Sequence, residues 1–572
     1  MRVVLLGAEL EENLGLRYLA SSLEREGHEA EIVGFDSEEE LARAVEQVIA
    51  IDPEITGLSM VFTGRAREFC RLAGALREAG YTGHIIAGGH FASFNCERLL
   101  KDFPAFDSVA LGEGEQIICS LARHLDEPGV VQGLAFRRED GSVQVNPSAG
   151  NPDDLDALPF PKRIKFHDYF GTPIASVLTS RGCWRDCAFC SINAWYKRGG
   201  GKKFRIRSIE NIVAELSELY FNHGVRIFNF QDDNFFVPNA ARALERFEAL
   251  QDGLARKDFG PMAIAVKARP DSITRETIGV LDELGLFRVF LGVENASVHG
   301  LQGLHRQCEL HTIYDSLQIL NDFDIHVAFN LLMFEPDTVM DDILTNLRFI
   351  ERHLDNPFNF CRAEAYAGTG LEDKLVREGR LLGDYFGFDY RLKDPRSEAF
   401  HHIANFAFFD RNFGDYGLHY FNMQVDFYFQ LLRRFHPECL TQSLRAASRS
   451  FIKRTNLDTY ELLSEIYDFV VAIDPADQLL IRAFAKEMRT RVDAHSQALY
   501  VEGERILRLI EGAYAQRGQG RAAAQLAQGE MPAFGCLAQP YAGIEQLEAA
   551  GTAQRPIPYP EFKRRLEEAA GS

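Results

Sequence analysis

The sequence predicts an α/β protein with three parts: a doubly wound, Rossmann-like N-terminal domain, a central partial (β/α)6 barrel and a mostly α-helical C-terminal domain. Short apolar runs alternate with amphipathic helical stretches over residues 1–130 and again over residues 173–370. Strands that alternate with helices form parallel sheets, so each stretch predicts one α/β domain. Beyond residue 370, aromatic-rich and long amphipathic helical patterns take over, and we assign them to a third domain over residues 371–572.

The first domain contains five predicted strands, over residues 3–6, 30–33, 55–59, 84–87 and 108–111. Ligands of doubly wound sheets bind at the carboxyl ends of the strands. Those ends carry a hydroxyl, a histidine, an acid and several glycines, namely Ser59, Gly88, Gly89, His90, Gly112, Glu113 and Gly114. Glycines let a bulky ligand approach the backbone closely. Ordinary strand-to-helix turns are the alternative for the glycines, and a solvated loop position is the alternative for His90.

Residues 131–172 are predicted to connect the two α/β domains. The segment around Asp140 and Gly141 predicts a small hairpin with these two residues at its turn. The following Pro- and Asp-rich segment, residues 151–163, predicts an extended linker.

The second alternation predicts the partial (β/α)6 barrel over residues 173–370. Its six candidate strands span residues 175–178, 226–230, 262–266, 289–291, 326–332 and 362–366. Active sites of parallel barrels lie at the carboxyl ends of the strands. Charged residues follow three of these strands: Asp232 and Asp233 the second, Arg269 the third and Glu294 the fourth. We therefore expect an active site at this edge of the barrel.

Three cysteines follow the first barrel strand with the spacing C-x3-C-x2-C: Cys183, Cys187 and Cys190. Cysteine thiolates are the usual ligands of iron–sulfur clusters, and three on one loop can hold three irons of a four-iron cluster and leave the fourth open. A structural zinc site usually needs four ligands, and no fourth Cys or His follows at a short distance. A redox C-x-x-C pair would leave Cys183 unused. The spacing therefore favours a [4Fe–4S] cluster.

This cysteine spacing, with Phe189 just before the last cysteine, resembles the radical SAM enzymes. In that family the open iron binds S-adenosylmethionine (SAM), and an electron passed through the cluster cleaves SAM to a 5′-deoxyadenosyl radical. The resemblance implies an external electron donor of the flavodoxin or ferredoxin type. It also implies SAM contacts, with Asp232 and Asp233 at the amino group, Glu294 at the ribose and Arg269 at the carboxylate. Surface ion pairs are the alternative for these residues.

The N-terminal domain, with its glycine-rich strand ends, resembles the cobalamin-binding domain that precedes many radical SAM enzymes. The D-x-H-x-x-G motif, whose histidine ligates cobalt in mutases, is absent from the sequence. The resemblance therefore implies cobalamin held base-off, without a histidine ligand, against the strand-end residues named above. Together the two resemblances imply a cobalamin-dependent radical SAM enzyme of the methylase type. It would use methylcobalamin and a 5′-deoxyadenosyl radical to methylate a carbon centre of a small-molecule or peptide natural product.

Three other functions remain open at this point. A cobalamin-dependent oxidative cyclase or ring-rearranging enzyme would use the same cofactors, and the product mass would separate it from a methylase. A methylthiotransferase would hold a second cluster on three N-terminal cysteines. Cys70, Cys96 and Cys119 are present, although inside helical patterns. A cobalamin-binding sensor would have no need of an iron that binds SAM.

The charge balance of 62 Lys and Arg against 83 Asp and Glu gives a net charge of −21. Such a protein repels phosphate backbones, so we expect no nucleic-acid substrate. No uninterrupted run of about 18 apolar residues predicts a membrane span, and the N-terminal residues show no signal segment. Several cysteines outside the cluster loop lie singly in apolar helical patterns, where buried thiols are the rule. We therefore expect a cytoplasmic protein.

The third domain contains an aromatic-rich region over residues 385–435, which its helical spacing assigns to a core or to a wall of the substrate cavity. Passing a methyl group from cobalt to a substrate carbon requires reacting atoms roughly 3–3.5 Å apart. We therefore expect the strand-end loops of both α/β domains to face one shared cavity. These loops are residues 88–90 and 112–115 in the first domain and residues 183–190 and 232–234 in the barrel.

Overall fold

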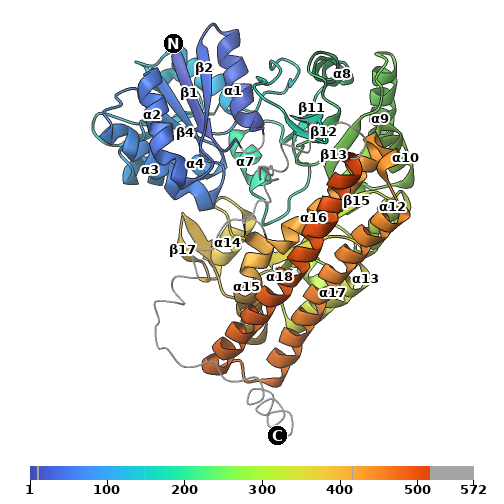
Figure 1. The fold of residues 1–572 in the computed structure, drawn as a ribbon. Coiled ribbons are helices and arrows are strands. Elements are labelled where there is room, and N and C mark those ends of the chain that lie inside the picture. Colours follow the sequence, from blue (N-terminus) through green and yellow to red (C-terminus); the bar gives the residue numbers. More distant parts are fainter. Residues whose placement is uncertain (10–11, 149, 415–416, 516–572) are drawn as a thin grey trace.

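The computed structural model describes residues 1–9, 12–148, 150–414 and 417–515, which form two adjacent α/β units and a layer of long helices (Figure 1). The N-terminal unit, drawn in blue, lies beside the partial barrel, drawn largely in green. The long C-terminal helices, drawn in orange and red, pack against the barrel. This architecture is the one predicted from the sequence. The part of the predicted third domain beyond residue 515 lies outside the described residues.

The sheet of the N-terminal unit consists of β1 (Arg2–Gly7), β2 (Glu29–Gly34), β3 (Ile55–Ser59), β4 (His84–Gly88), β5 (Ser108–Ala110), β6 (Leu134–Arg137) and β7 (Val143–Val145). Its strand order is β2-β1-β3-β4-β5-β6-β7. The five predicted strands are present, and all are parallel. The hairpin that we placed in the connector instead completes this sheet, because β6 pairs antiparallel with β5, and β7 pairs with β6.

Helices cover both faces of this sheet. α1 (Leu14–Arg25) and α6 (Gly114–Arg123) pack on one face, which includes Val3 and Leu5 of β1. α2 (Leu41–Ile51), α3 (Ala66–Glu78) and α5 (Cys96–Asp102) pack on the other, which includes Val4 and Leu6. A short helix, α4 (His90–Phe94), directly follows β4. The parallel order 2-1-3-4-5 places a topological switch point between β1 and β3, where such sheets bind ligands.

The barrel sheet consists of β8 (His167–Tyr169), β9 (Thr172–Val177), β12 (Ile227–Phe230), β13 (Ala263–Ala268), β14 (Leu286–Glu294), β15 (His326–Phe334) and β16 (Phe358–Arg362). Its order is β16-β15-β14-β13-β12-β9-β8. Six strands are parallel, as predicted, and β8 adds an antiparallel edge. β16 begins earlier than we predicted. Its residue Phe358 already pairs with Phe329 of β15, and the strand ends at Arg362.

The helices of the barrel unit are α7 (Ser191–Gly199), α8 (Ile209–Ser217), α9 (Ala240–Ala255), α10 (Arg275–Leu284), α11 (Val298–Gly303), α12 (Leu310–Asp322), α13 (Met340–Arg352) and α14 (Gly370–Arg377). Two short antiparallel ribbons accompany them. β10 (Ser180–Gly182) pairs with β11 (Phe204–Ile206), and the cysteine loop lies between these two strands in the sequence. β17 (Leu382–Asp384) pairs with β18 (Gly387–Asp389).

Four long helices follow the barrel: α15 (Pro395–Phe413), α16 (Leu418–Phe435), α17 (Gln442–Ala472) and α18 (Gln478–Ala515). α16 crosses the amino ends of the central barrel strands. The ring centroid of its Phe427 lies 5.2 Å from that of Phe287 at the start of β14. Its Arg434 Nε donates to the carbonyl of Met262, just before β13, at 2.8 Å. The aromatic residues of α16 therefore belong to the core and cover the end of the barrel where its strands begin.

None of the helices in the described part of the chain is both long enough and apolar enough to cross a membrane.

Candidate functional site

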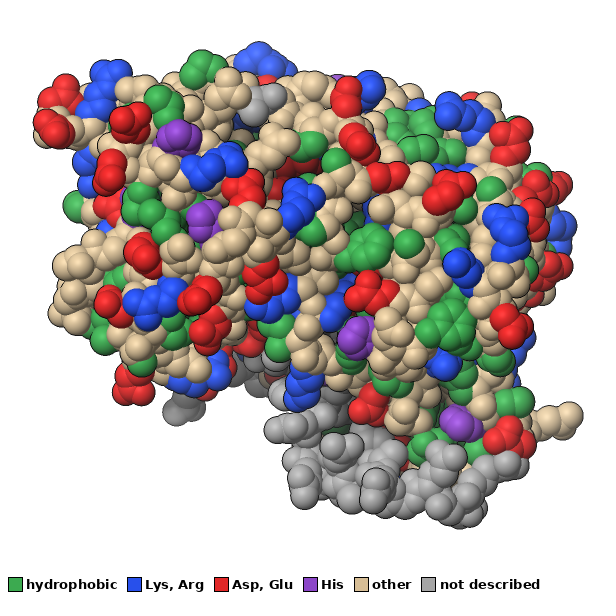
Figure 2. Space-filling model, turned by 90° about the horizontal axis from the view of Figure 1, so that it is seen from above, with side chains coloured by type: hydrophobic (Ala, Val, Ile, Leu, Met, Phe, Trp, Pro, Cys, Tyr) green, Lys and Arg blue, Asp and Glu red, His purple; other side chains and the backbone are tan. Residues whose placement is uncertain are grey.

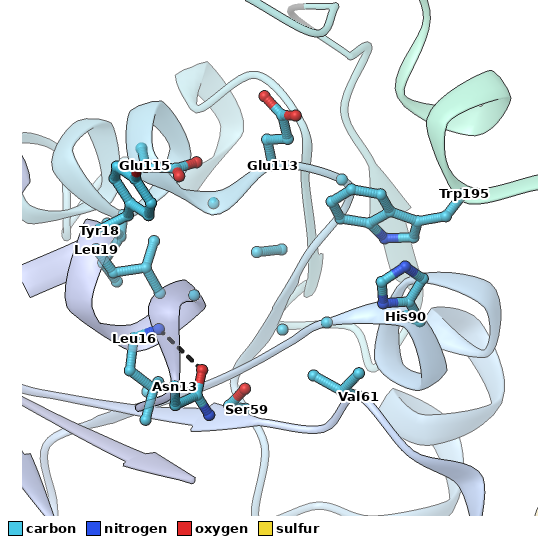
Figure 3. Close-up of a pocket in the computed structure, with 18 of the residues that line it drawn as sticks. Asn13, Leu16, Tyr18, Leu19, Ser59, Val61, His90, Glu113, Glu115 and Trp195 are labelled. Atoms are coloured by element: carbon cyan, nitrogen blue, oxygen red, sulfur yellow. Dashed lines mark hydrogen bonds between the residues drawn. The ribbon is translucent and has the colours of Figure 1, made fainter. Parts of the chain in front are cut away.

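A cavity of about 320 Å³ lies where the N-terminal unit meets the barrel (Figure 3). The N-terminal unit contributes the carboxyl ends of β3, β4 and β5 with all seven strand-end residues singled out in the sequence. These are Ser59, Gly88, Gly89, His90, Gly112, Glu113 and Gly114. The barrel unit contributes Ser180, Arg181, Gln231 and Asp233, together with Trp195 and Tyr196 of α7. Strand-end loops of both units therefore share one cavity. Residues 88–90, 112–115 and Asp233 line it as expected, whereas the cysteine loop, residues 183–190, does not.

The N-terminal half of the cavity is apolar and reaches into the body of the sheet. Its lining includes Leu5 of β1, Leu19 of α1, Ile86 of β4 and Ile118 of α6. A Cβ atom at Gly57 would lie 2.9 Å from the Leu5 side chain, closer than real side chains tolerate. The glycine thus allows the leucine to stay packed in the sheet. This apolar half of the cavity, which we call the apolar arm, lies at the switch point between β1 and β3 and suits a flat, largely apolar group.

One wall of the cavity is an aromatic pair with one ring from each unit. Trp195 stacks on His90 with ring centroids 4.6 Å apart, and its Nε1 donates to Ser93 Oγ at 3.3 Å (Figure 3). Burial lowers the pKa of His90 to about 4, so the ring is neutral at neutral pH. Its Nε2 is buried and has no hydrogen-bond partner among the described residues. Since α7 starts directly after Cys190, one helix connects the cysteine loop to this wall.

Four buried charges join the two units beside the cavity, and we call them the clasp: Glu113 and Glu115 of the N-terminal unit, and Arg181 and Arg205 of the β10–β11 ribbon. Arg181 lies 2.6 Å from Glu115 and 3.4 Å from Glu113, and Arg205 also pairs with Glu113. None of the four side chains is more than 10% exposed. Burial alone would raise the pKa of Glu115, but the Arg181 guanidinium holds it below its usual value.

The clasp changes the interpretation of Glu113. In Figure 3 its carboxylate points away from the centre of the cavity, and both oxygens are engaged by Arg205. Glu113 therefore positions the ribbon that frames the cysteine loop, in addition to lining the cavity.

The three cysteines lie on the loop between β10 and α7, outside the cavity lining. Burial raises the pKa of Cys183, and it raises that of Cys190 to about 12. Arg269 and Arg306 each donate to Cys187 Sγ, at 3.6 and 3.4 Å. A cysteine must lose its proton to bind metal, and neighbouring guanidinium groups favour the thiolate. Within the described residues, no group of three His, Cys, Asp or Glu side chains surrounds a single metal position.

The two adjacent acids after β12 lie in different surroundings. Asp232 is fully buried, and its carboxylate accepts hydrogen bonds from the hydroxyls of Thr179 and Ser180, at 2.8 and 2.5 Å. It does not line the cavity. Asp233 lines the cavity and accepts a hydrogen bond from the Gly182 backbone at 3.0 Å. Burial raises the pKa of both acids. Of the pair, Asp233 is the one available to a ligand.

Glu294 and Arg269 lie beside the cysteine loop and not in the cavity lining. Glu294 ends β14 with a φ of 65°, a strained conformation for a residue other than glycine, and such strain clusters at functional sites. Burial raises the pKa of its carboxyl group, which lies 3.7 Å from Arg306. The guanidinium of Arg269 is occupied on all three nitrogens. Besides Cys187, it donates to Asp271 at 2.9 Å and to the carbonyl of Arg306 at 2.8 Å.

Sequence reasoning missed several residues of the site, among them Arg181, Arg205, Arg306 and Trp195. The two clasp arginines could have been predicted from the sequence, because they flank the cysteine loop and two glutamates follow β5. Opposite charges at two strand ends that face each other indicate an interface. Arg306 and Trp195 belong to no motif, and only the folded chain brings them to the site.

Two family models match the chain. Residues 3–122 match the B12 binding domain, and residues 177–350 match the Radical SAM superfamily. The first match covers all seven strand-end residues of the N-terminal unit. The second contains the cysteine loop, Asp233 and Arg306.

Among curated proteins, the chain is similar to an uncharacterized methyltransferase of Pyrococcus horikoshii, with 25% identity over 64% of this chain and 79% of that protein. It is 31% identical to the hopanoid C-3 methylase of Methylococcus capsulatus over 57% of this chain and 61% of that protein. It is 26% identical to the anaerobic magnesium-protoporphyrin IX monomethyl ester cyclase of a Synechocystis species, over 49% of this chain and 59% of that protein.

Among solved structures, the cobalamin-dependent S-adenosylmethionine radical enzyme OxsB with aqua-cobalamin and S-adenosylmethionine bound matches with a TM-score of 0.64. The identity is 15%, and the match covers 100% of this chain and 83% of that chain. At this identity the similarity concerns the fold.

Proposed function

Because this chain belongs to the cobalamin-dependent radical SAM enzymes, we propose that it is a methyltransferase acting on a carbon centre of a small-molecule or peptide natural product. The observation that carries this proposal is the shared cavity, whose two halves come from the B12 binding domain and the radical SAM domain. When bound, the cluster and SAM supply a 5′-deoxyadenosyl radical, and cobalamin supplies the methyl group. The electron comes from an external donor of the flavodoxin or ferredoxin type.

We assign the cluster to Cys183, Cys187 and Cys190. The free thiols on this loop suit it, and Arg269 and Arg306 each donate an N–H group to the sulfur of Cys187. Cys183 and Cys190 must lose their protons before they can bind the cluster, although burial raises the pKa of both thiols. We therefore expect cluster assembly to release protons. A cytoplasmic setting, which keeps thiols reduced, suits this chemistry.

We assign the SAM ammonium to Asp233, because a buried cation needs a carboxylate partner and this one faces the cavity. Asp232 contributes indirectly by holding Thr179 and Ser180 at the end of β9. Glu294 is the candidate acceptor for the ribose hydroxyls. Arg269, whose guanidinium is already engaged, acts on the Cys187 thiolate in this assignment and not on the SAM carboxylate.

We assign cobalamin to the N-terminal half of the cavity. Backbone at Gly88, Gly89, Gly112 and Gly114 presents a surface without side chains to the edge of the corrin, and Ser59 adds a hydroxyl. The apolar arm between β1 and β3 suits the nucleotide base of cobalamin in the base-off form. The barrel side of the cavity, with Asp233, then faces the other side of the corrin.

The two alternative functions, methylthiotransferase and oxidative cyclase, differ in how well they fit the structure. A second cluster, as in a methylthiotransferase, would need Cys70, Cys96 and Cys119 together. Cys70 and Cys96 are buried on one face of the N-terminal sheet and Cys119 on the other. An oxidative cyclase uses the same cofactors, and the similarity to the magnesium-protoporphyrin cyclase keeps it as the second candidate.

The test needs no knowledge of the substrate. The anaerobically reconstituted protein is loaded with cobalamin, reduced and given SAM with a deuterated methyl group. A methyltransferase should form about one equivalent of S-adenosylhomocysteine per cobalamin, since SAM donates its methyl group there, and also 5′-deoxyadenosine. A cyclase should form 5′-deoxyadenosine without S-adenosylhomocysteine, and that result would contradict the proposal.

Replacing all three cysteines, Cys183→Ala, Cys187→Ala and Cys190→Ala, is the matched control. The variant should lose the cluster absorbance and the formation of 5′-deoxyadenosine. Reductive SAM cleavage by this variant would show that the cluster is held elsewhere.

A further inference from the structure

The segment that carries the cysteine loop has a charge opposite to that of the rest of the chain. Residues 181–207 contain eight Lys and Arg and one acidic residue, Asp186, in a protein of net charge −21. On the face shown in Figure 2, acidic and basic side chains alternate instead. A local excess of this size is a feature of the segment and not of the surface in general.

Only part of this positive charge is used inside the protein. Three of the eight residues, Arg181, Arg205 and Arg207, are buried and paired with glutamates. The other five lie at the surface, and we call them the basic rim: Arg185, Lys197, Arg198, Lys202 and Lys203.

Three cations of the basic rim gather around Asp186. Lys197 and Lys203 approach the same oxygen of Asp186, at 2.8 and 2.9 Å. Lys203 also lies 3.5 Å from the carbonyl of Arg185. The side chains of Lys197 and Lys202 remain 58% and 69% exposed. Arg185 and Lys202 pair with two other carboxylates, Asp271 at 2.5 Å and Asp153 at 3.1 Å. Five cations against these two carboxylates and Asp186 leave the rim with a net positive charge.

The rim lies over the cysteine loop. Arg185 and Asp186 stand between Cys183 and Cys187 in the sequence, and Trp184 packs on Phe204, next to Lys203. The barrel holds the loop through Ala188, whose N–H donates to the Leu304 carbonyl at 3.0 Å and whose carbonyl accepts from Leu371 N–H at 2.9 Å. The shared cavity adjoins the other end of α7. The rim is therefore the exposed approach to the loop that needs an electron.

We propose that the basic rim docks an acidic, one-electron carrier protein of the flavodoxin or ferredoxin class. This inference rests on the proposed function, which requires such a donor. In the step it serves, the carrier loses one electron and the cluster gains it. That electron then enters the SAM sulfonium as its C–S bond breaks, giving methionine and the deoxyadenosyl radical. A chain of net charge −21 repels acidic proteins elsewhere, whereas a positive patch orients them and speeds association.

The test compares two triple variants. The rim variant is Lys197→Gln, Arg198→Gln and Lys202→Gln, which changes no contact to the cluster cysteines or the clasp, although Arg198 also donates to Cys96 Sγ of α5 at 3.7 Å. The control variant, Arg482→Gln, Lys486→Gln and Arg505→Gln, removes three exposed cations from α18. The probe is a flavodoxin of net negative charge, kept reduced by NADPH and its reductase.

Binding of flavodoxin is the first readout, measured by surface plasmon resonance over a range of salt concentrations. Wild type and control variant should bind alike and weaken as salt screens the charges. The rim variant should associate about tenfold or more slowly, because steering by charge contributes factors of this order. Equal association rates for rim variant and wild type would overturn the proposal. So would a single-stranded oligonucleotide that binds the rim as tightly as flavodoxin does.

The second readout is the rate of 5′-deoxyadenosine formation with two reductants. With flavodoxin the rim variant should be slower than wild type. With sodium dithionite, a small reductant that needs no docking surface, the two should be equal. A rim variant that is equally slow with dithionite has a damaged cluster site, so its slow rate with flavodoxin would not support docking, and the association rate alone would decide the proposal. Wild type that forms no 5′-deoxyadenosine with dithionite contradicts the proposed function instead, while the binding measurement still decides the rim.

Discussion

His90 lies in the wall of the shared cavity with its ring against Trp195, and this contact decides how it acts on a bound corrin. Its Nε2 is buried, so the ring would have to leave the stack before this nitrogen could reach cobalt. Burial lowers the pKa of His90 to about 4, which makes it a neutral, flat surface at neutral pH. We therefore infer a packing role for His90.

We predict that His90→Phe leaves the cobalt environment unchanged. Phenylalanine keeps a flat ring against Trp195, whereas His90→Ala removes the stack and should lower stability by about 0.5–1.5 kcal/mol. The measurement is the electron paramagnetic resonance spectrum of bound cob(II)alamin, which should lack nitrogen splitting in wild type and in His90→Phe alike. Nitrogen splitting in wild type that disappears in His90→Phe would identify His90 as a cobalt ligand.

At the scale of single residues, the sequence predicts those whose chemistry is carried by spacing. The three cysteines can be recognised because one loop must present three thiols, and the strand-end glycines because a ligand must approach the backbone. Asp232 and Asp233 look equivalent in the sequence. Only the fold shows that the Asp232 carboxylate accepts hydrogen bonds from Thr179 and Ser180, and that Asp233 faces the cavity.

The β10–β11 ribbon is the element that connects the cysteine loop to the N-terminal unit. It frames the cysteine loop, and Arg181 and Arg205 tie it to the strand-end loop of β5. Buried charges of this kind are costly when left unpaired. The clasp therefore favours one arrangement of the two units over others.

We predict that Glu113 and Arg205 are energetically coupled. Glu113→Gln, Arg205→Met and the double variant form a cycle in which the coupling should be about 0.5–3 kcal/mol. Glu113→Gln leaves Arg205 without its carboxylate, and Arg205→Met leaves Glu113 with only the longer contact to Arg181, at 3.4 Å. The measurements are thermal unfolding and cobalamin affinity. The contact of Arg205 with the Pro152 carbonyl is lost in both arginine variants and so cancels.

An exposed ion pair between the same units provides the control for this cycle. Arg67 and Asp384 lie 3.2 Å apart with side chains 55% and 60% exposed. Their coupling should stay within about 0–1 kcal/mol, as is usual for surface pairs. Additive effects at Glu113 and Arg205, no larger than those at the surface pair, would show that the clasp does not position the ribbon.

At the scale of elements, parallel strands are the most predictable part of the fold. Each is a short apolar run buried on both faces, so its position follows from composition. The β6–β7 hairpin was predicted as a hairpin but assigned to the connector, because a two-stranded unit gives no indication of the sheet it joins. Its pairing with β5 depends on contacts far apart in the sequence.

Besides the Trp195–His90 pair, three further sets of contacts among the described residues help to hold the N-terminal unit against the rest of the molecule. The clasp is one, and the ribbon β17–β18 is the second. The rings of Tyr385 and Phe386 at its tip lie 6.0 and 5.5 Å from that of Phe91 in α4, and the Tyr385 hydroxyl donates to Asp102 at 2.7 Å. The aromatic residues at this tip therefore join units. We had expected the aromatic region to form core or to wall the cavity.

The third set is a buried chain of charges that runs from the N-terminal unit through the linker to the barrel. Arg163 of the linker lies 3.0 Å from Glu12 and 2.7 Å from Glu215 of α8. Glu12 also accepts a hydrogen bond from the Ser176 backbone of β9 at 2.6 Å. These side chains are between 2% and 8% exposed, which removes most of the screening by solvent.

We predict that this chain of charges, and not the linker's surface contacts, keeps the cavity assembled. Glu12→Gln should destabilise the contact by up to about 3–5 kcal/mol, because it removes one of the two carboxylates that pair with the buried Arg163, and the other, Glu215, is shared with Arg207. The linker offers a matched control in Lys162, which lies 2.5 Å from Glu24 with side chains 30% and 41% exposed. Glu24→Gln should cost no more than about 1 kcal/mol.

Hydrogen exchange distinguishes these two variants at the level of the whole molecule. In Glu12→Gln the Ser176 amide loses its charged acceptor, so it should exchange faster, and cobalamin should be released faster from the loosened cavity. Exchange in α17 and α18, which lie in the helical layer against the barrel, should stay as in wild type (Figure 1). Equal exchange at Ser176 in wild type, Glu12→Gln and Glu24→Gln would mean that this chain of charges does not hold the two units together.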